Sequence, residues 1–563
     1  MAARRAGFRD ATVWLAEIVG PDAAYVRLGL VYTVAITLLA LATPISVQVL
    51  INSVAYTAAP TQLWTLAAVL LILLLIVAGL SALRVWVMAL FERRVFARVV
   101  AEITVRAVYA QNPFFGDERR TDLFNRYFDL TVVQKAVPSL VIGAFTILLQ
   151  SAVALAITSF YHPFFLAFNA ILLLLLLMVW LVWRRGAITG AVALSHAKHD
   201  TARWLESVGS SNGFYKSSRH LSFAMDRSEA MTEGYVDAHC RYFRYSFAQT
   251  LSFLLIYAVA SAALLALGGN LILSGQLSIG QLVAAELILS GVFYGISQLG
   301  WYLDTLYDLT ASCEELSLLF AIPQEPVVTT GQGPKDGAVR LRDVRMHDAC
   351  FDFELRSGER LVAAAEPGVE RMLTMLLKRH VAPDRGLVSV GGADLGSLDM
   401  YLLRSAITVL DRPTIVEVTI REYLALAAPG ASADVMLDVL DLVGLGQRVA
   451  TLPAGLDTTL ASSGWPLTIA EVMELKLANA LLSRPRVLML SPLFDVMRVE
   501  RLRRVLDGLR EAGTTVLLCT GRPEAIELDG WFWLGRQSQR RLGSLKELQE
   551  LLDGREAGHA KPA

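Results

Sequence analysis

The residues from 361 to 374 have the spacing of a phosphate-binding loop without its chemistry. Such a loop, G-x-x-x-x-G-K-[ST], uses glycines so that backbone N–H groups can surround the phosphates, a lysine for the β- and γ-phosphates, and a hydroxyl for Mg²⁺. In this chain the two glycine positions hold Ala365 and Glu370. The lysine position holds Arg371 and the hydroxyl position holds Met372. The pattern predicts a strand, a tight loop and a helix that lack the groups for a nucleotide and its metal.

The interior of this loop strengthens that interpretation. Gly368 is the glycine that remains, and the carboxylate of Glu370 would repel a phosphate through like charge. Strand-like runs alternate with helical runs after residue 339, which indicates an α/β domain of about 220 residues to position the loop. The expected strands are Val339–Val344, Arg360–Ala365, Ala406–Leu410, Val487–Leu490 and Thr515–Cys519.

The first half of the chain has the composition of a membrane domain. The chain has 563 residues, 54% of them hydrophobic, and a mean hydropathy of +0.48. Residues 28–83, 136–183 and 245–285 contain no Asp, Glu, Lys or Arg. Each stretch can hold two crossings of about 20 residues, so six spans are predicted. They are placed at about 26–50, 63–90, 138–160, 163–184, 247–268 and 278–303.

Lysine and arginine placement predicts the orientation. The connections 91–137 and 184–246 are rich in these residues, whereas the short turns between the paired spans carry none. By the positive-inside rule the two connections, both termini and the α/β domain face the cytoplasm. Glu286 lies early in the sixth span, about 10 Å from the outer surface, where a charge should face a cavity or a polar partner. Contact with a substrate and a hydrated outer vestibule both remain open for it.

Two segments of the long connections are candidate docking helices. Thr121–Asp129 and Trp204–Phe214 each combine an apolar face with polar capping residues, although ordinary loop helices share this pattern. The candidate coupling residues are Thr121, Phe124, Tyr127, Trp204 and Phe214.

With this organisation the chain resembles an exporter half-transporter of the ATP-binding cassette (ABC) superfamily, from about residue 12 to 552. The resemblance implies a six-helix α-helical transmembrane domain followed by an α/β cassette domain like that of P-loop NTPases. Residues 271–285 look like the linker into the sixth helix of bacterial type I secretion and peptide exporters. The expected divisions are an interfacial segment 1–24, a transmembrane domain 25–322, a linker 323–338, a degenerate nucleotide-binding domain 339–555 and a tail 556–563.

The family's other motifs are degenerate where this chain can be matched to them. Asp411 occupies the position of the glutamine that senses the γ-phosphate, and Gly521 that of the switch histidine. Leu490 and Ser491 stand where the family has the metal-binding aspartate and the catalytic glutamate. The position of the aromatic that stacks on adenine falls near 346–348, which contains none. The signature segment, L-S-G-G-Q in the family, reads Leu467, Thr468, Ile469, Ala470 and Glu471.

These substitutions predict a subunit without ATPase activity and without bound ATP or Mg²⁺, unless a partner supplies them. The resemblance implies a transport half in the bacterial inner membrane, paired with an ATPase-competent ABC subunit, and it suggests a periplasmic adaptor as a further partner. The alternative is a structural or regulatory membrane scaffold within a larger assembly. A net charge of −1 without a basic, aromatic-rich patch predicts no nucleic-acid partner.

Overall fold

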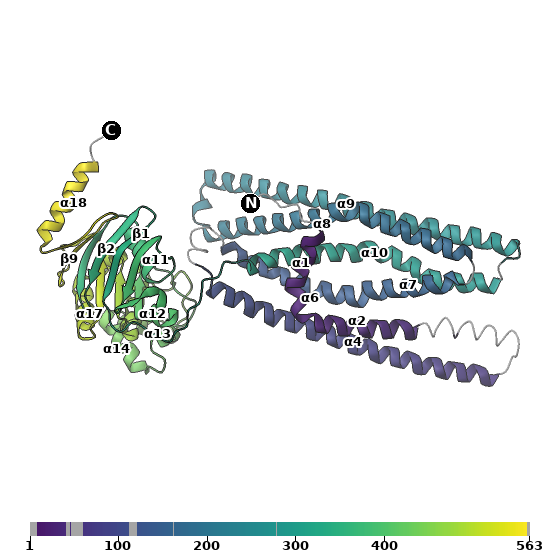
Figure 1. The fold of residues 1–563 in the computed structure, drawn as a ribbon, viewed down its shortest axis with the longest axis horizontal. Helices are drawn as coiled ribbons and strands as arrows, with labels where there is room; N and C mark the ends of the chain where they lie inside the picture. The colour runs from purple at the N-terminus through teal and green to yellow at the C-terminus, as the bar shows by residue number, and fades with distance from the viewer. Residues whose placement is uncertain are drawn as a thin grey trace. The chain divides into compact units, whose positions relative to one another are not determined.

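The computed structural model describes residues 8–40, 46, 60–111, 121–160, 163–276 and 279–559. The chain divides into two compact units, Met1–Gln324 and Glu325–Ala563. The first unit is helical and the second is an α/β domain (Figure 1). Each unit is described separately below.

The helical unit is built from long helices that lie side by side (Figure 1). Three of them, α4, α8 and α9, contain 49, 48 and 56 residues. At 1.5 Å per residue each is longer than a membrane crossing requires. The elements are α1 (Phe8–Val19), η1 (Gly20–Asp22), α2 (Ala23–Ala40), α4 (Pro60–Val108), η2 (Thr121–Asp129), α6 (Leu130–Ser139), η3 (Leu140–Ala144), α7 (Phe145–Ser159), α8 (Pro163–Ser210), η4 (Phe214–Lys216), α9 (Ser218–Leu273) and α10 (Ile279–Phe320).

Five helical stretches among the described residues are long and apolar enough to cross a membrane. They are Thr12–Ala40, Trp64–Val108, Leu123–Ser159, Pro163–Ser210 and Ser218–Leu273. The sixth predicted span falls within α10, which is not one of the five, so the number six stays a prediction. Most of the predicted first turn, residues 52–61, lies outside the described residues.

The N-terminal helix packs more deeply than an interfacial segment requires. In α1 the side chain of Ile18 is fully buried, and α1 packs against α10. In η1 the carboxylate of Asp22 is buried and pairs with Arg94 at 3.0 Å and with Arg98 at 2.7 Å, both on α4. The start of the chain is therefore fastened to the helical unit by apolar packing and by ion pairs.

The second unit contains two sheets. A four-stranded antiparallel sheet has the order β2-β1-β4-β5, and a six-stranded sheet has the order β10-β9-β3-β8-β7-β6. The strands are β1 (Val339–Met346), β2 (Ala349–Leu355), β3 (Arg360–Ala365), β4 (Arg385–Val390), β5 (Ala393–Asp394), β6 (Ile407–Leu410), β7 (Val487–Leu490), β8 (Thr515–Cys519), β9 (Gly530–Leu534) and β10 (Gln539–Leu542).

Helices cover the larger sheet, whose central strands are apolar throughout. All residues of β7 and β8 are buried, as expected for parallel strands with both faces covered. The main helices are α11 (Val369–Leu377), α12 (Met400–Ala406), α13 (Ile420–Ala427), α14 (Ala433–Val443), α15 (Gly446–Thr451), α16 (Ile469–Ser483), α17 (Val499–Glu511) and α18 (Leu545–His559). Helix α18 continues to His559, past the predicted domain end at residue 555, and that boundary stays a prediction.

Candidate functional site

The carboxyl ends of four parallel strands meet at one edge of the larger sheet. Strands β3, β8, β7 and β6 are neighbours in this order, and every pairing among them is parallel. Parallel strands point the same way, so the loops that follow them gather at one edge, where open α/β sheets bind ligands. The structure therefore brings together the predicted phosphate loop, Asp411, Ser491 and Gly521.

The loop after β3 has the backbone of a phosphate loop but directs its groups elsewhere. Gly368 has a φ of 85°, a conformation that favours glycine, and it forms the N-cap of α11. The N–H of Val369 donates to the carbonyl of Glu366 at 3.0 Å, so this donor is already used. Met372, at the hydroxyl position, packs against the apolar core of the domain. A thioether in that environment does not suit Mg²⁺, which prefers hard oxygen ligands.

Arg536, in the turn between β9 and β10, bridges this loop to the turn after β1. Its guanidinium forms an ion pair with Asp348 and donates through Nη2 to the carbonyl of Pro367 at 3.3 Å. Its backbone N–H donates to Glu366 Oε2 at 2.8 Å. Asp348 lies in the region where the family's adenine-stacking aromatic is expected. We call this set of contacts the Arg536 bridge; the sequence analysis missed it because its members are about 170 residues apart.

The two residues at the end of β7 that match the family's metal and base positions, Leu490 and Ser491, offer no metal-binding carboxylate and no general base. The side chain of Leu490 is 1% exposed and belongs to the domain core. The hydroxyl of Ser491 accepts a hydrogen bond from the N–H of Leu493 at 3.4 Å, which makes Ser491 the N-cap of η7 (Pro492–Val496). Both residues thus have structural environments.

The loop after β8 is held by a carboxylate that sequence reasoning did not identify. Asp495 Oδ2 accepts a hydrogen bond from the N–H of Gly521 at 2.9 Å, and Asp495 Oδ1 accepts one from Thr520 Oγ1 at 2.5 Å. Arg522 Nη2 donates to the carbonyl of Asp495 at 2.6 Å. These bonds fasten η7 to the end of β8 without a histidine.

The loop after β6 places Asp411 close enough to the half-buried Lys378 for their charges to interact. Lys378 follows α11 and donates from Nζ to the carbonyl of Arg404 at 3.0 Å. Burial, aided by the charge of Arg404 and opposed by that of Asp411, lowers the pKa of Lys378 to about 8. Since α11 has nine residues, Lys378 lies about 13 Å beyond the predicted phosphate loop.

The segment predicted to be a degenerate signature begins α16 and caps that helix. Thr468 and Glu471 form a capping box, in which the N–H of Thr468 donates to Glu471 Oε2 at 2.8 Å. Glu471 also pairs with Arg448 at 3.2 Å. A carboxylate in the first helical turn already compensates the positive end of the helix. Leu467 is buried, Ala470 is half-buried and Ile469 is 60% exposed. This helix end therefore offers a poor surface for a phosphate.

The first docking segment is helical, as predicted. It forms η2, which packs against α10 and α8 and leads directly into α6. Tyr127 is half-buried and meets Phe96 edge to face, with ring centroids 6.1 Å apart. Phe124 keeps 39% of its surface exposed. The side chain of Thr121 lies outside those that the structure describes.

The second docking segment is not one separate helix, which corrects the prediction. Helix α8 continues to Ser210, so Trp204 belongs to its last turns, and Phe214 begins the short η4 at the turn into α9. Trp204 Nε1 donates to Ser228 Oγ of α9 at 2.8 Å. Trp204 therefore fastens the two helices together, whereas Phe214, 60% exposed, stacks on His220 at the tip.

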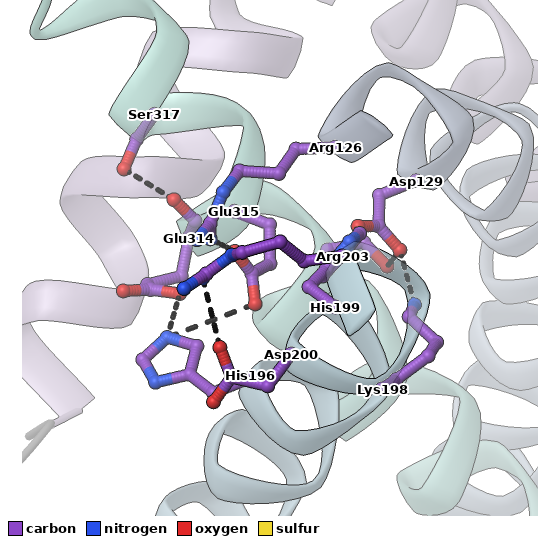
Figure 2. A network of polar contacts seen from close by, with 11 residues as sticks. Arg126, Asp129, His196, Lys198, His199, Asp200, Arg203, Glu314, Glu315 and Ser317 are labelled. Atoms are coloured by element: carbon purple, nitrogen blue, oxygen red, sulfur yellow. Dashed lines mark hydrogen bonds and ion pairs between the residues drawn. The ribbon is translucent and has the colours of Figure 1, made fainter. Parts of the chain in front are cut away.

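A network of charged side chains joins η2, α8 and α10 (Figure 2). Buried Asp129 of η2 accepts hydrogen bonds from Lys198 Nζ at 2.6 Å and from His199, both on α8. Ser312 of α10 donates to the same carboxylate at 3.4 Å. Burial alone would raise the pKa of Asp129, but the hydrogen bonds from His199 and Lys198 outweigh it and hold that pKa below its ordinary value.

A second part of the network lies beside the first. His196 Nε2 is 2.9 Å from Glu314 Oε2 and 3.7 Å from Glu315 Oε1 (Figure 2). Glu315 is fully buried and forms an ion pair with Arg126 of η2. The three His and Glu ligand atoms lie within 4.8 Å of one another, as in a metal site, but Arg126 supplies the positive charge. In the sequence, the only sign of this network was the large number of charged residues in the two long connections.

Glu286 lies on an exposed face of α10. The cavity between α7, α8 and α10 has a volume of about 720 Å³ and is lined by other residues, nearly all apolar. The expected vestibule or substrate contact of Glu286 stays a prediction.

Comparisons with known proteins agree with this architecture. No protein-family model matches the chain. It is 26% identical to the cyclolysin secretion/processing ATP-binding protein CyaB of Bordetella pertussis over 285 residues, which cover 48% of this chain and 40% of that protein. It therefore matches less than half the length of that relative. It is 23% identical to the leukotoxin translocation ATP-binding protein LktB of Mannheimia glucosida over 522 residues, covering 88% of this chain and 72% of that protein.

The fold is similar to that of a bacterial Atm1-family ABC exporter whose structure was solved with ATP bound. The TM-score is 0.73 and the identity 17%, and the match covers 98% of this chain and 99% of that chain. At this identity the likeness establishes the fold.

Proposed function

We propose that this chain, an ABC exporter half-transporter, is a transport subunit whose own cassette neither binds nor hydrolyses ATP. The observation that carries the proposal is the chemistry at the carboxyl edge of the larger sheet. The family's phosphate-binding lysine corresponds to Arg371, and its metal-binding aspartate corresponds to Leu490. The residue that activates the attacking water corresponds to Ser491, and the histidine that contacts the γ-phosphate corresponds to Gly521.

The missing groups act together in catalysis. Phosphoryl transfer depends almost wholly on positioning and on stabilisation of charge, and each lost element typically costs about 3 kcal/mol of transition-state stabilisation. The Arg536 bridge supports the proposal further, since Glu366 and Pro367 of the loop are already bonded to Arg536 of the chain itself.

The energy for transport would then come from a partner. The relatives are named as ATP-binding proteins of toxin secretion and translocation, and on this basis we propose an ATPase-competent ABC subunit as the second half. The chain is a multi-pass membrane protein by its apolar helices and its fold. We further propose six spans in the bacterial inner membrane, with both termini and the cassette in the cytoplasm and a periplasmic adaptor as an additional partner.

Equilibrium binding tests the nucleotide part of the proposal. The purified full-length protein is expected to show no saturable binding of a fluorescent ATP analogue with Mg²⁺ up to millimolar concentration, because the family's lysine and metal-carboxylate positions hold Arg371 and Leu490. Stoichiometric binding in the micromolar range would contradict the proposal. An intact ABC exporter measured in parallel shows that the analogue reports binding.

A membrane scaffold is the second candidate function. The capped signature helix and the Arg536 bridge favour it, because both describe a cassette whose contacts do not depend on nucleotide. Purification of the tagged chain from its native membrane separates the two functions. Recovery of an intact ABC subunit supports the transport half, and recovery of other membrane proteins without one supports the scaffold.

The exposed tip between α8 and α9 offers a test of coupling. Phe214→Ala removes a large, exposed apolar side chain, which contributes about 2 kcal/mol when such a residue anchors an interface. We expect the partner's ATP hydrolysis to lose its response to transported substrate while the complex still assembles. Phe223→Ala, which removes a similarly exposed side chain on α9, is the matched control. An unchanged substrate response would exclude Phe214 from the coupling contact.

A further inference from the structure

The helical unit contains a buried arginine without a carboxylate partner among the described residues. Arg84 lies on α4 and is 8% exposed. Its Nη1 donates to Thr33 Oγ1 of α2 at 3.1 Å and to Thr146 Oγ1 of α7 at 3.0 Å. Its Nε is buried and has no hydrogen-bond partner. The charge of Arg84 is therefore held by two neutral hydroxyls.

The sequence around this arginine supplies no compensating acid. Residues 28–83 and 136–183, which include both threonines, contain no charged residue. On α10 the carboxylate of Asp304 already accepts hydrogen bonds from Tyr242 and Ser246. A charge inside a membrane domain normally pairs with another charge or faces a polar cavity.

Arg84, Thr33 and Thr146 lie within the predicted membrane spans, near the end of the second span that leads into the 91–137 connection. Arg84 is eight residues from Glu92, the next charge along α4, which corresponds to about 12 Å. Thr33 is six residues from Arg27, or about 9 Å. This depth is close to the level of the lipid headgroups and adjoining acyl chains of one leaflet.

Two further features distinguish the site from an ordinary helix contact. Thr37, one helical turn beyond Thr33 on α2, is 1% exposed, and its buried hydroxyl has no hydrogen-bond partner in the part of the chain that the structure describes. Thr33 Oγ1 also approaches the carbonyl of Val141 at 3.4 Å, within η3, a π-helical turn between α6 and α7. Single π-helical turns inside α-helices occur frequently at functional sites.

We propose that Arg84, with Thr33, Thr37 and Thr146, binds the oxyanion headgroup of an amphiphile from the adjacent leaflet. Both hydrogen bonds use Nη1, so the edge of the guanidinium that carries Nε and Nη2 is left for the ligand. That edge matches a carboxylate or a phosphate, each of which accepts two parallel N–H bonds. The site is independent of the cassette, and its ligand need not be the transported molecule.

Melting temperatures of the full-length protein in a neutral maltoside detergent test the site. The probes are oleate, dioleoyl phosphatidylglycerol and the uncharged monoolein. We expect one or both anionic probes to raise the melting temperature, and monoolein to have no such effect. A response to oleate alone identifies a carboxylate ligand, and a response to phosphatidylglycerol alone identifies a lipid phosphate.

Variants connect this response to the site. Arg84→Gln is expected to increase the half-saturating concentration by about tenfold or more, since it removes the charge-assisted hydrogen bonds. Arg93→Gln, on an exposed face of the same helix, should respond like the wild type. If the glutamine variant does not fold, Arg84→Lys keeps the charge without the fork and should still bind about tenfold more weakly.

Three outcomes would overturn the proposal. The first is an equal response of the wild type and the tested Arg84 variant. The second is a response lost equally in Arg93→Gln, which would indicate attraction to general surface charge. The third is a wild-type protein that does not distinguish the anionic probes from monoolein.

Discussion

Exchanging Leu490 for aspartate is expected to destabilise the cassette by about 3 kcal/mol or more, without creating a metal site. Leu490 is 1% exposed and pairs in register with Leu410 on β6 and Leu518 on β8. The new carboxylate would lie between Leu410 and Leu518 in this apolar core, and neither side chain can pair with a charge. A buried charge without a partner costs far more than the change in side-chain volume.

The thiol of Cys519 on β8 reports this loss. Burial raises the pKa of Cys519 to about 12, so the thiol reacts only when the strand is exposed to solvent. Labelling of Cys519, followed by peptide mass spectrometry across a denaturant series, should show earlier exposure in Leu490→Asp. Leu490→Met conserves volume and should stay within about 1.5 kcal/mol of the wild type. A stable aspartate variant with Mg²⁺-dependent ATP binding would refute the assignment of this strand end.

The second large effect is expected from Asp129→Asn. The side chain of Asp129 is 2% exposed, forms an ion pair with Lys198 and is hydrogen-bonded to His199, both on α8. The amide has no charge, and its NH₂ group would face donors, so we expect a loss of about 3 kcal/mol in the helical unit. Because η2 leads into α6, this unit should also lose the fixed position of its first docking segment.

The stability lost through Asp129→Asn is expected to depend on pH. The pKa of Asp129 is lowered in the folded state, so the ionised carboxylate stabilises the protein above the ordinary pKa of 3.8. That contribution is lost as pH falls through the lowered folded value, and Asp129→Asn should lack this part of the acid decline. Thermal melting between pH 7 and pH 3 measures it. Asp200→Asn, which breaks an exposed pair with Arg203 on α8, should change stability by less than about 1 kcal/mol and is the control.

The strands around the cassette site could be predicted because each is a short apolar run. The expected Arg360–Ala365, Val487–Leu490 and Thr515–Cys519 are the observed bounds of β3, β7 and β8. The order of loop, helix and strand therefore placed the degenerate motifs at strand ends. The antiparallel strands β2 and β4 were not among the predicted strands, although β2 alternates apolar and acidic residues from Phe351 to Leu355.

The contacts that close the site could not be read from the sequence. The Arg536 bridge depends on a turn that returns beside the phosphate loop after about 170 residues. The pairing of His196 with Glu314 likewise joins residues 118 apart. The helix expected at 204–214 was wrong because a capping-rich segment can also continue a helix when a neighbour such as Ser228 stabilises it. The coupling role of Trp204 stays a prediction.

The Arg536 bridge also bears on how the cassette responds to the energy state of the cell. A cassette that binds ATP gains stability by mass action, about 4 kcal/mol when the nucleotide is at a thousand times its dissociation constant. A cassette that binds no ATP, and whose loop is held by Arg536, would have a stability that does not depend on the ATP concentration. Its folded fraction is then expected to stay the same when ATP is depleted, because the loop after β3 is held by bonds from Arg536 of the chain itself.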